Sequence, residues 1–251
     1  GSLVALLGVV LAILLVDHHW AAPLALLAAF GVGGALGGVH AFLIAKARIQ
    51  PFIVTLCGLL LYRGIARFIA NDETKGFGNA EGYEWLKEAA TGNLGGVPIP
   101  LVMLLVVAAA LWVVLHRSVY GRYLFAVGRN EEAARFSGVN TRMVEAGAYV
   151  IGALLASVSA VLFAFYTNSV SPSSHGNFYE LYGIAAAVLG GFSLRGGEGS
   201  VIGVLLGAAL LQLLQNLVNL LGIPSSLNLA VMGAVILLGV LADGLLFRRK
   251  S

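Results

Sequence analysis

Charged residues are scarce in this chain. Only 11% of its 251 residues are Asp, Glu, Lys or Arg, while 59% are hydrophobic and the mean hydropathy is +0.92. A soluble domain usually carries about 25% charged residues. The shortage excludes an ordinary soluble domain, and the long uncharged runs predict an all-α, polytopic bundle of transmembrane helices in a lipid bilayer. The net charge of only +3 gives no indication of nucleic-acid binding.

Cysteine is almost absent. Cys57 is the single cysteine, and it lies in the apolar run PFIVTLCGLLLY. A disulfide within the chain is therefore impossible, and no zinc-binding or redox spacing exists. We interpret Cys57 as a small apolar residue of a membrane span.

Motifs of ATP-hydrolysing and metal-dependent enzymes are also missing. No G-x-x-x-x-G-K-[ST] sequence is present, and the glycine-rich LGGFSLRGGEGS at 189–200 lacks the lysine of a phosphate loop, so we interpret it as a tight turn. No H-E-x-x-H pair occurs, and no acidic residue lies at the centre of a strong span, which argues against a proton relay. We expect no catalytic residue, no metal site and no bound cofactor.

Long apolar runs predict where the chain crosses the bilayer. About eight spans are expected, at 3–16, 21–45, 51–70, 99–117, 143–166, 181–193, 200–221 and 226–247. The span at 181–193 is short, and the opening run is also shorter than the roughly 20 residues that a full crossing needs.

Basic residues indicate how these spans are oriented. If residue 1 faces the cytoplasm, most of the 15 basic residues fall on the inner side, namely Lys46, Arg48, Arg117, Arg122, Arg129, Arg135, Arg142, Arg195, Arg248, Arg249 and Lys250. Basic loops prefer the cytoplasm, so this orientation is favoured. It requires the short segment 181–193 to cross the membrane.

Two polar stretches then lie on the outer side. Residues 71–98 are long and acidic, and their pattern predicts an amphipathic helix over 80–90 with an apolar face formed by Tyr83, Leu86 and Ala90. Residues 167–180 predict non-helical backbone, which is tolerated beside short spans where it lines a wet cavity or is buried in protein.

Glycines recur every four residues in two of the predicted spans. The pattern comprises Gly33 with Gly37, Gly34 with Gly38, and Gly199 with Gly203 and Gly207. Glycines at this spacing share one helix face and let a neighbouring backbone approach closely. They predict tight helix–helix packing.

Four amides share one face of the span at 200–221: Gln212, Gln215, Asn216 and Asn219. A row of amides facing lipid is costly, so this face is expected to look into protein or water. Two interpretations remain open, namely hydrogen bonds between helices and the wall of a path for a neutral polar solute. Asn168, Asn177 and Asn228 could extend such a path.

The segment 128–140, GRNEEAARFSGVN, is charged yet lies between two apolar runs. Asn130 is suited to cap a short helix, and Glu131 and Glu132 would occupy its first turn, where the helix dipole favours negative charge. Gly138 marks its end. The pattern predicts a helix of about seven residues that forms without help from the bilayer.

This short helix is expected on the inner membrane surface. One side would carry Ala133, Ala134 and Ser137, and the other side would carry the charges. Asn140 is suited to cap the helix that follows. Because an ordinary cytoplasmic loop needs none of this order, the segment is suited to be a rigid contact for a soluble partner.

Several segments, taken in their order and spacing, point to one family. They are ARIQPFIVTLCGLLLYRG, VPIPLVMLLVVAAALWVVLHRSVYGRY, GRYLFAVGRNEEAARFSGVN, YELYGIAAAVLGGFSLRGGEGSVIGVLLGAALLQLLQNLVNLLGI and the closing VILLGVLAD. Together they resemble the membrane permeases of bacterial ABC importers of the ribose, xylose and galactoside type. The resemblance covers nearly the whole chain.

The resemblance implies a transport subunit of the bacterial inner membrane that catalyses no reaction itself. Two such permeases, identical or different, would enclose the path for a neutral sugar. A cytoplasmic ATP-binding subunit would grip the coupling helix, and an extracytoplasmic sugar-binding protein would dock at 71–93 and 167–180. The coupling residues would be Gly128, Asn130, Glu131, Glu132, Ala133, Ala134, Ser137 and Gly138.

The resemblance also bears on domain organisation. Residues 1–251 are expected to form one permease domain, with 128–140 as the coupling loop and 71–98 as an extracytoplasmic insertion. Family members have about ten spans, so the domain is expected to lack its N-terminal spans here. Two alternatives remain: the same architecture carrying nucleosides or branched-chain amino acids, and a channel or secondary transporter that needs no ATP.

Overall fold

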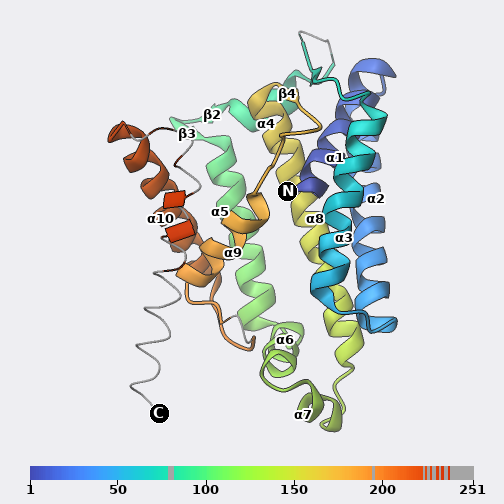
Figure 1. The fold of residues 1–251 in the computed structure, drawn as a ribbon, viewed down its shortest axis with the longest axis vertical. Helices are drawn as coiled ribbons and strands as arrows, with labels where there is room; N and C mark the ends of the chain where they lie inside the picture. Colours follow the sequence, from blue (N-terminus) through green and yellow to red (C-terminus); the bar gives the residue numbers. More distant parts are fainter. Residues whose placement is uncertain are drawn as a thin grey trace. The chain divides into compact units, whose positions relative to one another are not determined.

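The computed structural model describes residues 1–78, 82–193 and 196–222, together with 224, 227, 230, 231, 233, 234 and 237. Asn228 and most of the predicted span 226–247 lie outside the described residues. Helices dominate the described part, and the connections between them contain two short antiparallel pairs of strands (Figure 1).

The longer helices follow the predicted apolar runs. In chain order they are α1 (Ser2–Ala12), α2 (Ala22–Ala41), α3 (Pro51–Ile69), α4 (Glu84–Thr91), α5 (Ile99–Trp112), α6 (Val119–Arg129), α7 (Glu131–Phe136), α8 (Thr141–Thr167), α9 (Tyr179–Leu189) and α10 (Val201–Leu220). Three of them continue into π-helical turns, η1 (Ile13–Asp17), η2 (Phe42–Lys46) and η3 (Val113–Arg117). The strands pair as β1 (Lys75–Gly76) with β4 (Ser169–Val170) and as β2 (Asn93–Leu94) with β3 (Val97–Pro98).

Membrane-spanning length is reached by five helices within the described residues. They are Ala22–Lys46, Pro51–Ile69, Ile99–Arg117, Thr141–Thr167 and Val201–Leu220. Ser2–Asp17 and Tyr179–Leu189 are apolar but shorter. The 11 residues of α9 cover roughly 16 Å, about half of the hydrocarbon core, so the predicted span at 181–193 is a half-length helix.

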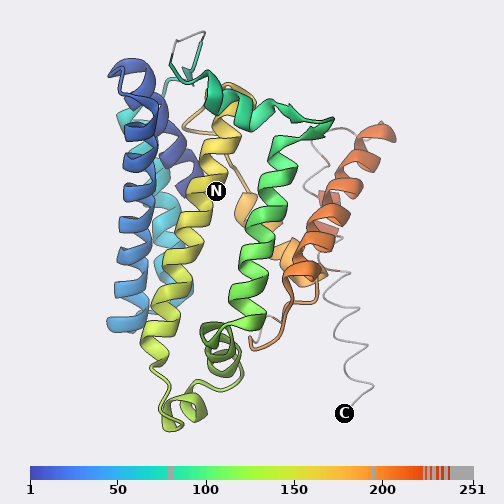
Figure 2. The ribbon, with the colours of Figure 1, turned by 180° about the vertical axis from the view of Figure 1, so that it is seen from behind.

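The chain divides into two compact units. Unit 1 comprises Gly1–Val107 and Asn140–Asn177, and unit 2 comprises Ala108–Val139 and Phe178–Ser251. In unit 1, α1 packs against α2, α3 and α8, and its side chains Leu7, Val9 and Leu11 are among the largest that are fully buried. Both ribbon views show α1 within this group (Figures 1 and 2).

Glycines set the contact between α2 and α8. A Cβ atom added at Gly37 would lie 2.7 Å from the Cβ of Ala153, and one added at Gly33 would clash with the hydroxyl of Ser157. At Gly38 nothing lies within 4 Å of that position. The predicted close packing is therefore confirmed for the Gly33–Gly37 pair, whereas Gly38 lies on an open face of the same helix.

One end of unit 1 holds the polar stretch 71–98. The ring of Phe77 lies 4.6 Å from that of Phe165, and the hydroxyl of Tyr83 donates a hydrogen bond to the carbonyl of Phe77. Lys75 forms a 3.2 Å ion pair with Asp17. We call the end of unit 1 that carries residues 71–98 the acidic end. These contacts anchor the stretch to the ends of the helices.

The amphipathic helix predicted over 80–90 is α4, and it begins at Glu84. Its predicted apolar face is confirmed, since Tyr83, Leu86 and Ala90 are all buried. Leu86 and Ala90 face the end of α8, which α4 contacts.

The sequence predicts non-helical backbone over 167–180, and the structure has it over 168–178, because Thr167 still belongs to α8 and Tyr179 begins α9. Arg63 holds the segment by donating hydrogen bonds to the carbonyls of Pro172 (3.1 Å) and His175 (2.8 Å). The His175 ring is buried and stacks on Phe163, with 4.2 Å between ring centroids. Its burial and the nearby charge of Arg63 lower the pKa of His175 to about 4, so the ring is neutral at physiological pH.

In unit 2, glycines bring α9 and α10 into backbone contact. A Cβ at Gly203 would lie 2.0 Å from the carbonyl oxygen of Gly190, and one at Gly207 would lie 2.1 Å from that of Ala186. The spacing of Gly203 and Gly207 therefore does what the sequence predicts. Gly199 instead lies against the ring of Phe192, outside the helix–helix contact.

The helix α6 is absent from the sequence-based predictions. Ser118 caps it by accepting a hydrogen bond from the backbone N–H of Gly121 (3.1 Å). Gly121 allows the close turn from η3, because a Cβ there would lie 2.0 Å from the carbonyl oxygen of Leu115. Hydropathy overlooks α6 because its apolar residues are mixed with Arg122 and Arg129.

Candidate functional site

The helix α7 lies at one end of unit 2, directly after α6 (Figure 1). The side-chain oxygen of Asn130 accepts a hydrogen bond from the backbone N–H of Ala133 (2.9 Å), which confirms the predicted cap. Gly138 ends the helix with a φ of +84°, a conformation suited to glycine. Asn140 caps α8 in the same way, through the N–H of Met143 (3.3 Å).

Most of the surface of α7 is open to solvent. Only Ala134 is buried, while Glu132, Ala133 and Ser137 are exposed. The side of the helix formed by Ala133, Ala134 and Ser137 is thus mostly open to solvent. Ala134 is the residue through which α7 packs on the rest of the protein.

Phe136 is the feature of α7 that sequence reasoning missed. Its side chain is 80% exposed, and the guanidinium of Arg135 lies over its ring at 5.8 Å from the centroid. An exposed aromatic ring beside an arginine is typical of the anchors in protein–protein interfaces. The sequence did contain a signal that could have identified Phe136, since it is the only aromatic residue of the charged segment 128–140.

Replacing Asn130 by Ala is expected to loosen α7, because the N–H of Ala133 loses its acceptor. Loss of an N-cap costs about 1 kcal/mol, so opening of the helix should become roughly fivefold more frequent. Limited proteolysis of the purified protein, followed at 128–140, measures this. Asn130→Asp keeps a capping oxygen and should be cut at the wild-type rate; equal cutting of all three proteins would contradict the assigned cap.

The last turn of α6, just before α7, rests on the loop that joins α9 to α10. A Cβ at Gly128 would lie 2.4 Å from the backbone nitrogen of Gly197, and one at Gly196 would lie 2.8 Å from the carbonyl oxygen of Gly128. The backbones are therefore in direct contact. Gly128, Gly196 and Gly197 form what we call the glycine joint, and it links α7 to the α9–α10 pair within unit 2.

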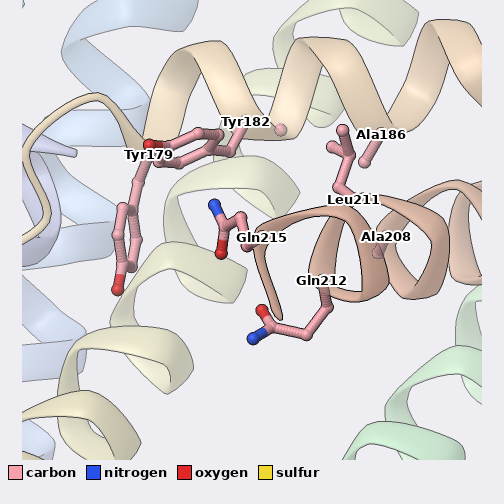
Figure 3. Close-up of a pocket in the computed structure, with 8 residues that line it drawn as sticks. Tyr179, Tyr182, Ala186, Ala208, Leu211, Gln212 and Gln215 are labelled. Carbon is pink, nitrogen blue, oxygen red and sulfur yellow. The ribbon is translucent and has the colours of Figure 1, made fainter. Parts of the chain in front are cut away.

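A pocket of about 360 Å³ opens between α9 and α10. It is lined by Tyr179, Tyr182, Gly183, Ala186, Ala208, Leu211, Gln212 and Gln215. The rings of Tyr179 and Tyr182 meet edge to face, with 6.2 Å between centroids. Figure 3 shows the side chain of Gln215 directed toward the two tyrosines. No charged residue lines the pocket among the described residues.

The structure separates the predicted path residues. Gln212 and Gln215 line the pocket, while Asn216 and Asn219 are exposed on α10 and do not line it. Asn168 and Asn177 belong to unit 1, where Asn168 ends α8 in a left-handed conformation with a φ of +53°. Asn228 lies outside the described residues. The tyrosines are the part of this pocket that sequence reasoning missed.

The chemistry of this pocket is that of binding. Two amides and two phenol groups offer hydrogen-bond donors and acceptors beside aromatic faces, a combination suited to an uncharged polar ligand. Within the described ranges, no three His, Cys, Asp or Glu side chains gather closely enough to hold a metal ion.

Comparisons with known proteins give a consistent result. The family model described as "Branched-chain amino acid transport system / permease component" matches residues 1–240. The ribose import permease protein of Escherichia coli K12 is 40% identical over 243 residues, which are 97% of this chain and 75% of that protein. No solved structure matches the chain.

Two further relatives extend the comparison. The ribose import permease protein of Haemophilus influenzae is 33% identical over 253 residues, covering 100% of this chain and 77% of that protein. The xylose transport system permease protein of Escherichia coli K12 is 29% identical over 307 residues, covering 100% of this chain and 78% of that protein.

Proposed function

Since the chain belongs to the permease-component family of branched-chain amino acid transport systems, we propose that it is the membrane subunit of an ATP-driven importer for a neutral sugar. It is a transport component of the bacterial inner membrane and not an enzyme. The relatives named for ribose and xylose import favour a sugar over the amino acids in the family description. The observation that carries the proposal furthest is the uncharged, aromatic pocket on α9 and α10.

The pocket is our candidate for a sugar-contacting part of the translocation path. Sugar hydroxyls can bond to the amides of Gln212 and Gln215, and a sugar ring can lie against an aromatic face such as Tyr182. A branched-chain amino acid would bring an ammonium and a carboxylate. Among the described residues that line the pocket, none carries a charge that could pair with either group.

The exposed face of α7 is our candidate for the contact with a cytoplasmic ATP-binding subunit. Two observations support this proposal: α7 is a capped helix, and its residues Glu132, Ala133 and Phe136 are exposed. A preformed helix binds with little loss of conformational entropy, which suits repeated engagement and release. The coupling residues predicted from the sequence are retained in this proposal, and Phe136 is added to them.

A route from α7 to the pocket follows from the glycine joint. A shift of α7 would press the backbone of Gly128 against Gly196 and Gly197, which connect to α9 and α10. Those two helices form the pocket, and their backbones touch at Gly190 and Gly203. We infer that movement driven by ATP reaches the sugar through these close backbone contacts.

Two further partners complete the proposed importer. The segments 71–93 and 167–180, predicted from the sequence, are kept as the candidate surface for an extracytoplasmic sugar-binding protein. A second permease subunit, identical or different, would close the path from the other side. The ordered cluster of Phe77, Tyr83 and Phe165 supports the first of these surfaces, because it makes the polar stretch rigid.

Replacing Gln215 by Leu is expected to lower sugar uptake about tenfold, because one hydrogen bond to the sugar is worth roughly 1.4 kcal/mol. The measurement is uptake of radiolabelled ribose or xylose into proteoliposomes that contain the permease, its ATP-binding subunit and its binding protein. Basal ATP hydrolysis should not change.

Asn219→Leu is the matched control, since Asn219 lies on the same helix outside the pocket. It should transport sugar at the wild-type rate. Equal losses in both variants would show that the whole amide face lines the path and would reject the pocket as the contact site. Uptake of a nucleoside in place of either sugar would reject the proposed substrate class, and uptake without ATP would reject the importer.

A further inference from the structure

A second pocket lies in unit 1, at the end opposite the acidic end. Its volume is about 350 Å³, and it is lined by Ala41, Phe42, Ala45, Lys46, Asn140, Arg142, Met143 and Ala146. These residues come from the end of α2, from the π-helical turn η2 and from the first turns of α8. We call it the basic pocket.

Two positive charges face the basic pocket. Lys46 and Arg142 both line it, and both are exposed. The ammonium of Lys46 lies 5.3 Å from the centroid of the Phe42 ring. Within the described part of the chain, neither cation forms an ion pair with a carboxylate. Two like charges that share one pocket repel each other, and an anion placed between them relieves that repulsion.

The remaining wall of the basic pocket is mostly apolar. Phe42 is 54% exposed and Met143 is 71% exposed, Ala41, Ala45 and Ala146 add to the apolar surface, and Asn140 is the one uncharged polar residue of the lining. Both helices that form the wall have the length and hydropathy of membrane spans. The pocket therefore combines a site for an anionic group with an apolar surface at the end of two spans, where headgroups and acyl chains meet.

We propose that the basic pocket binds an anionic phospholipid of the cytoplasmic leaflet, such as phosphatidylglycerol. The phosphate lies between Lys46 and Arg142, and the acyl chains lie along Phe42 and Met143. Basic pockets between membrane helices on the cytoplasmic side are suited to such headgroups. A free phosphate would leave the apolar wall exposed to water.

The bound lipid also has a structural consequence. Asn140 lines the basic pocket, caps α8 and follows the turn that ends α7. A lipid in the pocket holds η2 against the start of α8. It thereby fixes the position of Asn140, which follows α7 in the chain. Bilayer composition is thereby linked to the stability of this junction.

The test uses the intact purified permease in a neutral detergent, with thermal unfolding and native mass spectrometry as readouts. Phosphatidylglycerol is expected to raise the unfolding temperature and to remain bound in the mass spectrum. Phosphatidylcholine and inorganic phosphate should do neither. Replacing both Lys46 and Arg142 by Gln should weaken phosphatidylglycerol binding roughly 30-fold, or about 2 kcal/mol.

The controls decide between the possible sources of the effect. Lys46→Arg with Arg142→Lys keeps both charges and should keep binding, while Arg122→Gln removes an exposed cation outside the pocket and should have no effect. Equal protection by inorganic phosphate or by phosphatidylcholine would overturn the proposal. So would wild-type binding by the double Gln variant. If that variant does not fold, each single Gln variant should show part of the loss, and full binding by both would overturn the proposal.

Discussion

Glu132→Lys combined with Phe136→Ala is expected to abolish ATP-driven sugar uptake while the permease still inserts into the membrane at the wild-type level. Both side chains are exposed on α7 and therefore contribute little to folding. The change removes an aromatic anchor and reverses a charge on the face proposed to contact the ATP-binding subunit. Loss of one such anchor often costs 2 kcal/mol or more, about a 30-fold weaker complex.

Co-purification of the ATP-binding subunit with the permease, together with sugar-stimulated ATP hydrolysis in proteoliposomes, measures this effect. Arg122→Gln is the control, since Arg122 is exposed on the neighbouring helix α6 and is not one of the proposed coupling residues. It should behave as wild type. Stimulated ATP hydrolysis at the normal rate in the double variant would refute α7 as the contact.

Ala134 is unsuitable for this experiment. Its side chain is 6% exposed, so a large residue there would disturb α7 itself. Loss of activity in such a variant would report on folding and on partner binding together. The choice of Phe136 depends on knowing which side of a six-residue helix faces solvent.

Gly37→Leu is expected to lower the unfolding temperature of the permease by roughly 5 °C or more. A Cβ at Gly37 would meet the Cβ of Ala153 at 2.7 Å and the Cα of Val150 at 3.1 Å. The helices α2 and α8 would have to separate, and overpacking of this kind costs about 1–3 kcal/mol or more. Thermal unfolding in detergent, followed by intrinsic fluorescence, measures the change.

Gly38→Leu supplies a matched comparison from the next residue of the same helix. Nothing lies within 4 Å of a Cβ at Gly38, so leucine meets no backbone there. Replacing a helical glycine also adds about 1 kcal/mol of intrinsic helix stability in both variants. The Gly38 variant should therefore unfold at or slightly above the wild-type temperature. Equal destabilisation by the two changes would disprove the assigned α2–α8 contact.

The elements of the fold were largely predictable from the sequence. Apolar runs place α2, α3, α5, α8 and α10 within a few residues, because a long uncharged stretch has few alternatives to a membrane helix. The cap at Asn130 and the stop at Gly138 are likewise local, since each depends on atoms no more than a few residues apart. The helix α6 escaped prediction because its apolar and charged residues alternate without a long apolar run.

The candidate site was predictable only in part. The pattern of Gln212, Gln215, Asn216 and Asn219 identifies a polar helix face, but all four positions are equivalent by sequence. Only Gln212 and Gln215 line the pocket, because the packing of α10 on α9 through Gly203 and Gly207 decides which part of the face is covered. The tyrosines of α9 enter the site for the same reason.

The sequence by itself therefore determined that this is a helical membrane permease with a capped, charged surface helix. Hydropathy, capping and family motifs are read from residues that are neighbours along the chain. The tertiary structure alone decided which glycines bear contacts, which amides meet the tyrosines, and that Lys46 and Arg142, 96 positions apart, face one pocket. Such pairings depend on how separate helices pack. Patterns among neighbouring residues carry no information on which distant parts of the chain meet.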